Sequence, residues 1–142
     1  TFTEAQFRVP FNLSATRRIE TGDIVPQVPK HRLSVTTNYH PAEGWTLSLI
    51  GLYVSTQFYL NDEDNTQPRL PGYFQLNARV NYERPVPGGR LGGFLMLNNI
   101  LDREYSTSGI IASNVLTGGG AQERFVVPAP GFALYGGLTL HL

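Results

Sequence analysis

Apolar and polar residues alternate along most of this chain, which is the pattern of β-strands with one apolar and one polar face. The clearest example is residues 73–84, where Phe74, Leu76, Ala78, Val80 and Tyr82 stand at alternate positions. The 15 Gly and 10 Pro leave few uninterrupted windows for a helix. The pattern therefore predicts an all-β protein. Six strands are expected, at residues 1–9, 32–40, 45–59, 73–84, 90–101 and 131–142.

One face of these predicted strands meets an apolar environment. The apolar faces carry no charge in their interiors, whereas Glu4, Arg8, Arg32 and Arg79 fall on polar faces. Residues 90–101 are apolar on both faces at their centre, so their facing is left unassigned. Five of the six segments have nine to twelve residues, more than a usual globular strand and close to the roughly 9–11 of a tilted bilayer crossing.

Aromatic residues stand where the apolar stripes end. Tyr39 and Trp45 flank one predicted turn, and Phe74 and Tyr82 bracket one predicted strand. Such positions are typical of the aromatic belts at the two membrane interfaces. We therefore predict Tyr39, Trp45, Phe74, Tyr82 and Tyr105 as interface aromatics.

The connections between the predicted strands alternate in length. Residues 10–31, 60–72 and 104–130 form long connections, whereas residues 41–44 and 85–89 form tight turns. Outer-membrane barrels are built in this way, with short periplasmic turns and longer extracellular loops. The glycine-rich residues 116–121 are expected to be a mobile loop tip.

The number of strands has a further consequence. A single-chain bacterial barrel needs an even number of strands and at least about eight. An open sheet of six would leave unpaired backbone groups in hydrocarbon, at several kcal/mol each. The missing strands come either from residues upstream or from other copies of the chain. Because the sequence starts in mid-strand without a leader and stops on an apolar residue, we favour the C-terminal part of a larger barrel.

Composition excludes several other classes. Only 15% of residues are charged and the formal net charge is +0, so no basic field indicates a nucleic-acid partner. The absence of Cys excludes disulfides, thiolate metal sites and a cysteine nucleophile. No stretch of about 20 apolar residues predicts a transmembrane helix.

Candidate chemistry is sparse, and we expect no enzyme activity, cofactor or metal. No G-x-S-x-G or other nucleophile signature occurs. The carboxylates of Asp62, Glu63 and Asp64 suit a hard cation, but they match no complete EF-hand spacing, and a solvated charge run explains them. The three histidines are candidates for metal binding or catalysis, but solvation of their imidazoles is enough to explain them. They are His31, His40 and His141.

Four segments carry recognisable motifs. Residues 28–49 (VPKHRLSVTTNYHPAEGWTLSL) combine a P-x-H-R strand entry, a short turn and a Trp-led strand. Residues 71–83 (PGYFQLNARVNYE) place Tyr-Phe before an alternating strand, and residues 97–106 read LNNILDREYS. Residues 127–142 (VPAPGFALYGGLTLHL) contain a loop exit and a final strand. Together these segments resemble the C-terminal barrel segment of TonB-dependent outer-membrane receptors. The chain departs from the family at Phe132, where Arg is frequent, and at Leu142, where an aromatic is commonest.

The resemblance implies a fold and a function. The fold is an antiparallel up-and-down transmembrane barrel, to which residues 1–142 would contribute roughly the last six of about 22 strands. The function is TonB-energised uptake of a scarce ligand, such as iron–siderophore, cobalamin or a glycan, across the Gram-negative outer membrane. The family's plug domain and TonB-contacting segment have no counterpart here, so the chain should not transport alone. Its implied partners are outer-membrane lipid, the remaining strands and plug, and the TonB complex through the missing N-terminal region.

The final strand has a second implied role. In the family, the last strand is the signal that the barrel-assembly machinery recognises. The resemblance implies this role for five residues, although any lipid-facing strand has a similar pattern. They are Phe132, Leu134, Leu138, Leu140 and Leu142. Asp102, Arg103 and Tyr105 are interpreted as a structural unit at a strand end.

Two alternatives stay open. One is a short outer-membrane protein whose copies assemble into a pore. The other is a soluble ligand-binding β-barrel or sandwich, in which the apolar faces line a core. The alternating loop lengths and the terminal motifs favour the receptor segment over both.

Overall fold

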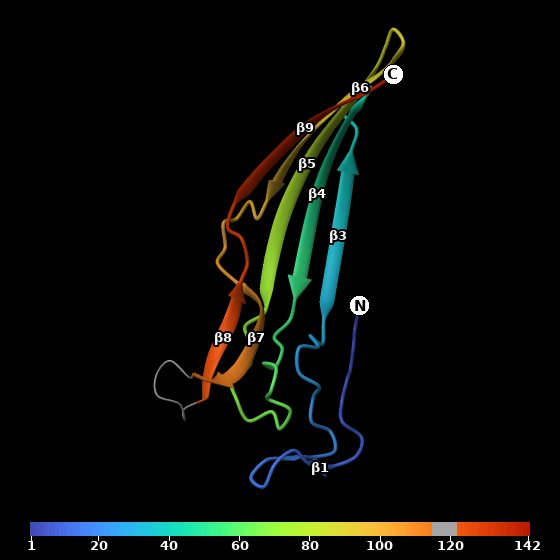
Figure 1. Ribbon diagram of the computed structural model, residues 1–142. Coiled ribbons are helices and arrows are strands. Elements are labelled where there is room, and N and C mark those ends of the chain that lie inside the picture. The colour runs from blue at the N-terminus through green and yellow to red at the C-terminus, as the bar shows by residue number, and fades with distance from the viewer. Residues whose placement is uncertain (115–121) are drawn as a thin grey trace. The chain divides into compact units, whose positions relative to one another are not determined.

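A computed structural model describes residues 1–114 and 122–142, and this part of the chain contains strands and no helix (Figure 1). The predicted mobile tip at 116–121 lies outside the described residues. The all-β prediction is confirmed. The strands are β1 (Phe11–Asn12), β2 (Arg18–Ile19), β3 (Arg32–Tyr39), β4 (Trp45–Val54), β5 (Tyr73–Val86), β6 (Gly89–Asn98), β7 (Ser106–Ser113), β8 (Gln122–Pro128) and β9 (Ala133–His141).

The chain divides into two compact units. The sheet unit comprises Leu33–Tyr53, Phe74–Glu104 and Pro130–Leu142. The loop unit comprises Thr1–Arg32, Val54–Tyr73 and Tyr105–Ala129. Each unit is therefore assembled from segments that are far apart in the sequence.

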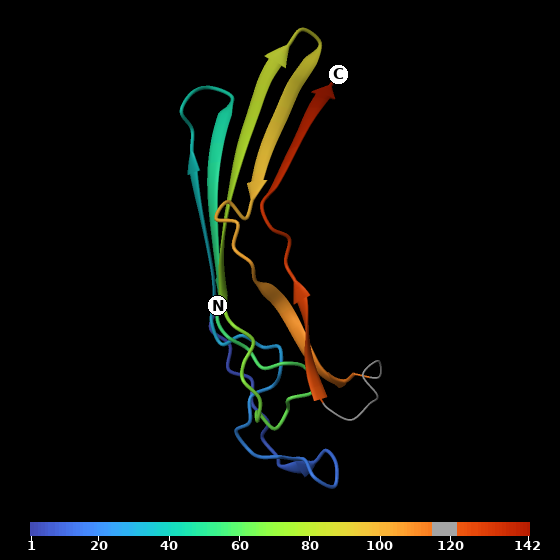
Figure 2. The same cartoon turned by 90° about the vertical axis from the view of Figure 1, so that its left-hand side faces the viewer.

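The sheet unit is built on one open five-stranded sheet in the order β3-β4-β5-β6-β9. β6 pairs antiparallel with both β5 and β9. The chain leaves the sheet after β6, forms β7 and β8, and returns as β9 beside β6. Figure 2 shows the β3–β4 and β5–β6 turns and the C-terminus at the same end of the sheet. This end is called the short-turn end below.

The two short turns depend on glycines with positive φ. Gly44 has φ 80° and Gly88 has φ 86°, values that L side chains rarely adopt. Pro87 precedes Gly88, and this Pro-Gly pair suits a turn with positive φ at its third position. A Cβ at Gly44 would also overlap the backbone carbonyl of Glu83. The local sequence thus specifies both tight connections.

The loop unit has its own apolar core. Tyr59, Leu70 and Ile111 form a buried cluster from two separate segments. β1 pairs with β2, and β7 pairs with β8 around an irregularity between Ser106 and Ser108. The unit also buries Ile19, Val54 and Phe58.

Residues 1–9 do not form the expected regular strand. They make only two isolated bridges, Phe2 with His31 and Gln6 with Ile24. The opposite segment contains Pro26 and Pro29, which have no N–H to donate. Gln27, between them, has φ 60° and donates its N–H to the carbonyl of Phe58 instead, at 3.0 Å. The partner segment therefore breaks the ladder, although the alternation of residues 1–9 suits a strand.

Other boundaries also differ from expectation. The strand predicted at 45–59 ends at Val54, because Ser55 donates its N–H to the carbonyl of His31 and the chain leaves the sheet. The strand predicted at 90–101 ends at Asn98, before Asn99 and Asp102 take positive φ. The long connection at 104–130 contains β7 and β8, which the sequence analysis missed.

Candidate functional site

The register of β5, β6 and β9 assigns the two faces of the sheet. One row across the strands joins Val80, Leu95 and Gly136, and the next joins Tyr82, Gly93 and Leu138. These rows lie on the face that carries the apolar residues of β5, called the apolar face below. The register therefore settles the facing of residues 90–101. Leu91, Leu95 and Leu97 lie on the apolar face, and Arg90, Phe94 and Met96 lie on the other, called the polar face.

The apolar face has no protein layer over it in the described part of the chain. Leu138 is 87% exposed, and Leu33, Leu95 and Leu134 are exposed as well. The sheet unit, all of whose residues are described, contains no buried apolar side chain. An exposed apolar surface of this extent in a stable fold needs an apolar partner. A bilayer satisfies this need for antiparallel strands of 8–14 residues.

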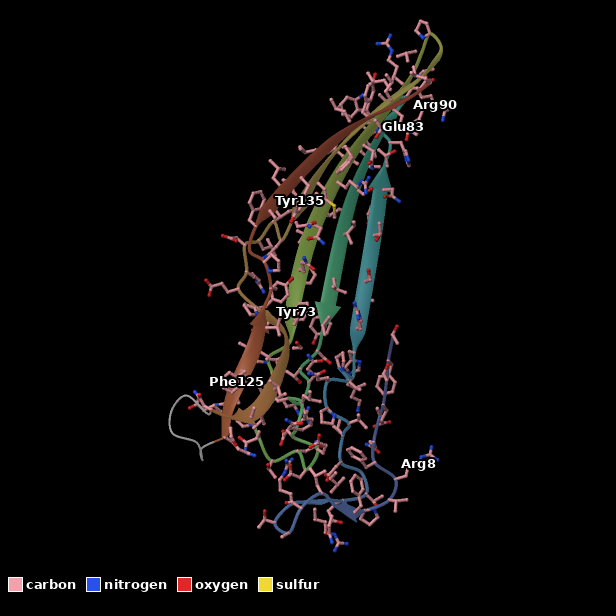
Figure 3. All side chains as sticks on the ribbon, in the orientation of Figure 1. Arg8, Tyr73, Glu83, Arg90, Phe125 and Tyr135 are labelled. Atoms are coloured by element: carbon pink, nitrogen blue, oxygen red, sulfur yellow. The ribbon has the colours of Figure 1, made fainter. Side chains whose placement is uncertain are left out.

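The polar face carries charged and hydrogen-bonding groups. The Arg79 Nε–H donates to Asn81 Oδ1 at 2.8 Å, and the guanidinium stacks over the ring of Phe94 at 4.8 Å from its centroid. The Phe94 ring in turn covers Gly137, where a Cβ would overlap it. Towards the short-turn end, Glu83 and Arg90 line an open groove (Figure 3). Polar side chains of this kind suit a water-filled or protein-filled barrel interior.

Four of the predicted interface aromatics lie in the sheet unit and one, Tyr105, lies in the loop unit. Trp45 and Tyr82 contact each other near the short-turn end, with ring centroids 4.6 Å apart. The exposed Tyr39 lies at the end of β3, just before the turn that Trp45 follows. Phe74 lies eight residues before Tyr82 on β5, a separation of about 27 Å along a strand. With the roughly 40° tilt of barrel strands, this corresponds to a height of about 21 Å, which lies within an apolar band about 25 Å tall. Tyr105 lies in the loop unit and stacks on Tyr73, at 4.3 Å and 22°.

The residues predicted as an assembly signal line one edge of the sheet. Leu134, Leu138 and Leu140 share the apolar face of β9. Phe132 and Leu142 flank this strand and are exposed. The arrangement presents an apolar row on the edge strand, interrupted at Gly136, and the assembly role stays a prediction.

The junction between β6 and β9 is held by Asn99, which is 1% exposed and has φ 49°. Its amide donates to the carbonyls of Arg103 (3.0 Å) and Pro130 (3.3 Å), and its Oδ1 accepts the N–H of Arg103 at 3.2 Å. Asp102 Oδ1 accepts the N–H of Phe132 at 2.8 Å. The residues after β6 therefore fix where β9 begins.

In the loop unit, Arg17 ties the β1–β2 hairpin to the acidic run. Its guanidinium donates to Asp64 Oδ1 at 2.6 Å, Asp64 Oδ2 at 3.2 Å and Glu63 Oε2 at 3.2 Å. A further bond reaches the carbonyl of Asn61 at 2.8 Å. The hydrogen bond from Arg17 lowers the pKa of the Asp64 carboxyl and raises the pKa of the guanidinium. The acidic run, predicted as solvated, is therefore partly engaged by a cation that the sequence analysis did not single out.

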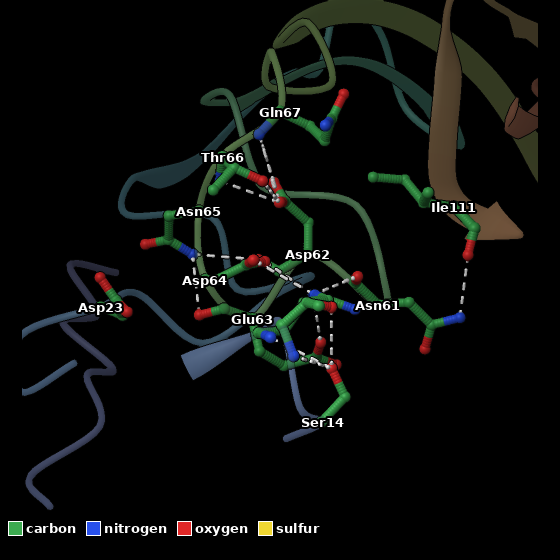
Figure 4. Close-up of polar contacts among 12 residues, drawn as sticks. Ser14, Asp23, Asn61, Asp62, Glu63, Asp64, Asn65, Thr66, Gln67 and Ile111 are labelled. Carbon is green, nitrogen blue, oxygen red and sulfur yellow. Dashed lines mark hydrogen bonds and ion pairs between the residues drawn. The ribbon is translucent and has the colours of Figure 1, made fainter. Parts of the chain in front are cut away.

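Asp62 and Asn65 organise the same loop (Figure 4). Asp62 is 1% exposed, and its carboxylate accepts the N–H groups of Thr66 (3.0 Å) and Gln67 (3.2 Å). Burial raises the pKa of this carboxyl, although those two hydrogen bonds oppose the shift. The Asn65 side chain accepts the N–H of Ile24 at 2.6 Å and donates to its carbonyl at 2.9 Å. The loop carboxylates thus act as turn caps and ion-pair partners.

The histidines do not converge on a site. His31 lies 5.4 Å from the Phe2 ring, His40 lines a groove at the β3–β4 turn, and His141 pairs with Arg90 in the sheet register. In residues 1–114 and 122–142, no cluster of three or more His, Asp or Glu is placed to hold a metal ion.

Sequence reasoning missed the residues that hold the loops together. Arg17, Asn65 and Asn99 act through backbone groups or partners more than 20 residues away. The available signal was weak: Asn tolerates the left-handed conformation, so an Asn directly after a predicted strand indicates a turn.

Comparison with models of known protein families identifies a family. Residues 1–100 match the family model described as "TonB dependent receptor-like, beta-barrel". The match includes β1 to β6, the first two motif segments and residues 97–100 of the third, whereas residues 101–142 lie beyond it. Within the part that the structure describes, no helix is long and apolar enough to cross a membrane.

Proposed function

Since that model matches 100 of its 142 residues, the chain belongs to the TonB-dependent receptor-like β-barrel family, and we propose that it forms the C-terminal strands of an outer-membrane receptor. The family is one of outer-membrane receptors and transporters, and not an enzyme family. The proposed receptor takes up a scarce ligand, of the iron–siderophore, cobalamin or glycan class, with energy from the TonB complex.

One observation carries the proposal: the two faces of the sheet have opposite chemistry. The rows through Leu95 and Leu138 are apolar and exposed, whereas the polar groups of Arg79, Asn81 and Glu83 lie on the opposite face. A sheet with lipid on one side and an aqueous or plug-filled interior on the other needs this segregation. A soluble sandwich would instead cover the apolar face with a second layer.

The free edges of the sheet support further strands in the complete protein. β3 and β9 each have one neighbour in the sheet of the described chain, and an unpaired edge is costly in hydrocarbon. In the proposed receptor, strands from an upstream region close the barrel, and a plug domain in that region occupies its interior and contacts TonB. The exposed apolar row of β9 serves as the signal for the barrel-assembly machinery.

Ligand contacts in the proposed receptor come from the loop unit and the polar face. The loop unit supplies segments from three long connections, and these are cross-linked by Arg17, Asn61 and Gln57 through hydrogen bonds to distant segments. On the polar face, Arg79 and Arg90 offer cationic groups for an anionic ligand.

The first test is the DNA sequence upstream of the codon for Thr1. An in-frame leader, plug and about sixteen further strands support the receptor. The second test measures uptake of radiolabelled ferric siderophores, cobalamin and maltodextrins by cells that express the full gene, with and without a functional TonB complex. We expect uptake of one class that is lost without TonB. A stop codon followed by a genuine start near Thr1 would contradict the proposal and favour the oligomeric pore.

A further inference from the structure

We propose that a groove on the apolar face, between Trp45 and Leu138, binds one glycerophospholipid of the membrane leaflet at the short-turn end. The acyl chain lies in the groove and the phosphate lies at Arg84. This inference rests on the proposed function, because it needs the apolar face to meet lipid.

The groove is a defined depression in the apolar face. It has a volume of about 690 Å³, within the roughly 300–1,000 Å³ of small-molecule sites. Its side-chain walls belong to four strands. They are Trp45 of β4, Val80 and Tyr82 of β5, Leu95 of β6 and Leu138 of β9. An open trough of this composition suits a hydrocarbon chain.

Glycines, which have no side chain, line part of the groove. Across β5, β6 and β9, Gly93 lies between Tyr82 and Leu138. In the neighbouring row, Gly136 of β9 lies beside Leu95, which pairs with Val80. A Cβ at Gly136 would lie 3.5 Å from Leu95 Cδ1 and 3.5 Å from the carbonyl oxygen of Phe94, which are ordinary contacts. A larger side chain at Gly136 is therefore compatible with the strand, and it would occupy the groove.

One end of the groove has an aromatic wall and a neighbouring cation. Trp45 and Tyr82 contact each other at 4.6 Å, and amphipathic rings of this kind favour the headgroup level. Arg84 follows two positions after Tyr82 on the same face and pairs with Leu91 in the next row. It is exposed and has no ion-pair partner among the described residues.

This arrangement is complementary to a phospholipid. The guanidinium of Arg84 presents a planar set of N–H donors that matches a phosphate in two-point geometry. An apolar trough next to an exposed cation fits an amphiphile with an anionic head and a hydrocarbon tail. The short turns of outer-membrane barrels face the periplasm, so the occupant comes from the leaflet on that side. The shared chemistry of its headgroups is the phosphodiester.

The test uses the full-length receptor, purified in a non-ionic detergent and titrated with a 16:0/18:1 phosphatidylglycerol while native mass spectrometry counts bound lipid. We expect one molecule to bind more tightly than the rest. R84Q should weaken this binding by about fivefold, the factor for one Arg near an anionic lipid surface. Gly136→Val should weaken it at least as much because it fills the groove.

Gly51→Val is the matched control. Gly51 lies on β4 in a separate apolar groove, and a Cβ there would also lie 3.5 Å from its neighbour, Phe74. This variant should bind lipid as the wild type does. Equal losses in Gly51→Val and Gly136→Val, unchanged binding in R84Q, or only non-saturable lipid adducts would overturn the proposal. Uptake of the receptor's ligand is measured in the same variants, so that a failed lipid site is distinguished from a failed transport function.

Discussion

The sheet unit and the loop unit differ in whether they have an apolar core. The loop unit has one, although it also exposes apolar residues such as Val9: Ile19 is 0% exposed, Leu70 is 2% exposed, and Tyr59 and Ile111 pack with Leu70. The sheet unit displays them on one face, and its only fully enclosed side chain is the polar Asn99. The difference fits the proposed function, in which water surrounds the loop unit and hydrocarbon covers one face of the sheet.

The two units also use polar groups differently. In the sheet, backbone hydrogen bonds between strands satisfy most polar groups, as a membrane-spanning structure requires. In the loop unit, side chains such as Asp62, Asn65 and Arg17 satisfy backbone groups of irregular segments. A substitution that places a polar or charged side chain on the apolar face of the sheet should therefore be among the most damaging.

The largest effect is expected from a charge on the apolar face. Leu97 pairs with Ala78 and Leu134, in the row halfway between the levels of Phe74 and Tyr82. Leu97→Arg should destabilise the full-length receptor by about 2–4 kcal/mol, because the bilayer centre opposes a guanidinium. Urea unfolding in lipid vesicles, followed by tryptophan fluorescence and gel mobility, measures this.

Tyr135→Arg is the control for that prediction, because Tyr135 lies on the polar face of the neighbouring β9 and is exposed. It should change the free energy of unfolding by less than about 1 kcal/mol. If the two substitutions cost the same, the apolar face does not meet lipid.

The next effect concerns the one enclosed polar side chain of the sheet unit. Asn99→Ala should cost about 2–3 kcal/mol in the same unfolding assay, since it leaves the backbone groups of Arg103 and Pro130 without their partner and places Ala at positive φ. Asn99→Gly removes the same hydrogen bonds but tolerates the φ of 49°. It should therefore be less damaging than Asn99→Ala. A smaller loss for Ala than for Gly would show that the hydrogen bonds and the backbone conformation do not act as described.

A third effect should stay within the loop unit. A Cβ at Gly109 would lie 2.5 Å from the Tyr59 ring and 3.1 Å from the carbonyl oxygen of Phe125. Gly109→Ala should therefore cost about 1–2 kcal/mol by overpacking the buried cluster. Hydrogen exchange should increase in β7 and β8 and remain unchanged in β5 and β6. Gly51→Ala on β4 serves as a well-accommodated comparison, because a Cβ there lies at an ordinary 3.5 Å from Phe74. Faster exchange in β5 and β6 would show that the effect is not confined to the loop unit.

The sheet unit could be predicted from the sequence far better than the loop unit. Alternation at positions such as Leu76, Val80 and Leu134 reports directly on a two-faced strand, and the Pro87-Gly88 pair marks a tight turn. Where both faces are apolar, as at Phe94 and Leu95, only the pairing with β5 and β9 assigns them. Within the sheet unit, the periodicity of the sequence is thus enough to locate the strands. It is not enough to assign every residue to a face.

The loop unit depends on contacts that no local pattern contains. The residues 1–9 alternate like a strand, yet Pro26, Gln27 and Pro29 in the opposite segment break the ladder. Arg17 reaches Asp64 across 47 positions, so the local charge pattern alone predicts a solvated acidic run. The predicted roles of β9 in assembly and of the aromatics at the interface stay predictions, because they depend on machinery and lipid outside the chain.

The smallest effect is expected at the ion pair between Arg17 and Asp64, which is only partly buried. Asp64→Asn should cost about 1 kcal/mol locally, measured as roughly fivefold faster hydrogen exchange in β1 and β2 at neutral pH.

The pH dependence of this protection follows from the carboxyls of Asp64 and Asp62. The pKa of Asp64 is lowered below 3.8, so its contribution is present above that pH and is lost as the pH falls through the lowered value. Asp62 acts oppositely: its pKa is raised, and protonation relieves the cost of its burial as the pH falls. Protection of β1 and β2 should therefore persist from pH 7 to about pH 4 and fall only below it. In Asp64→Asn the fall below pH 4 should disappear, and its persistence there would assign the acid sensitivity to another carboxyl of the loop unit.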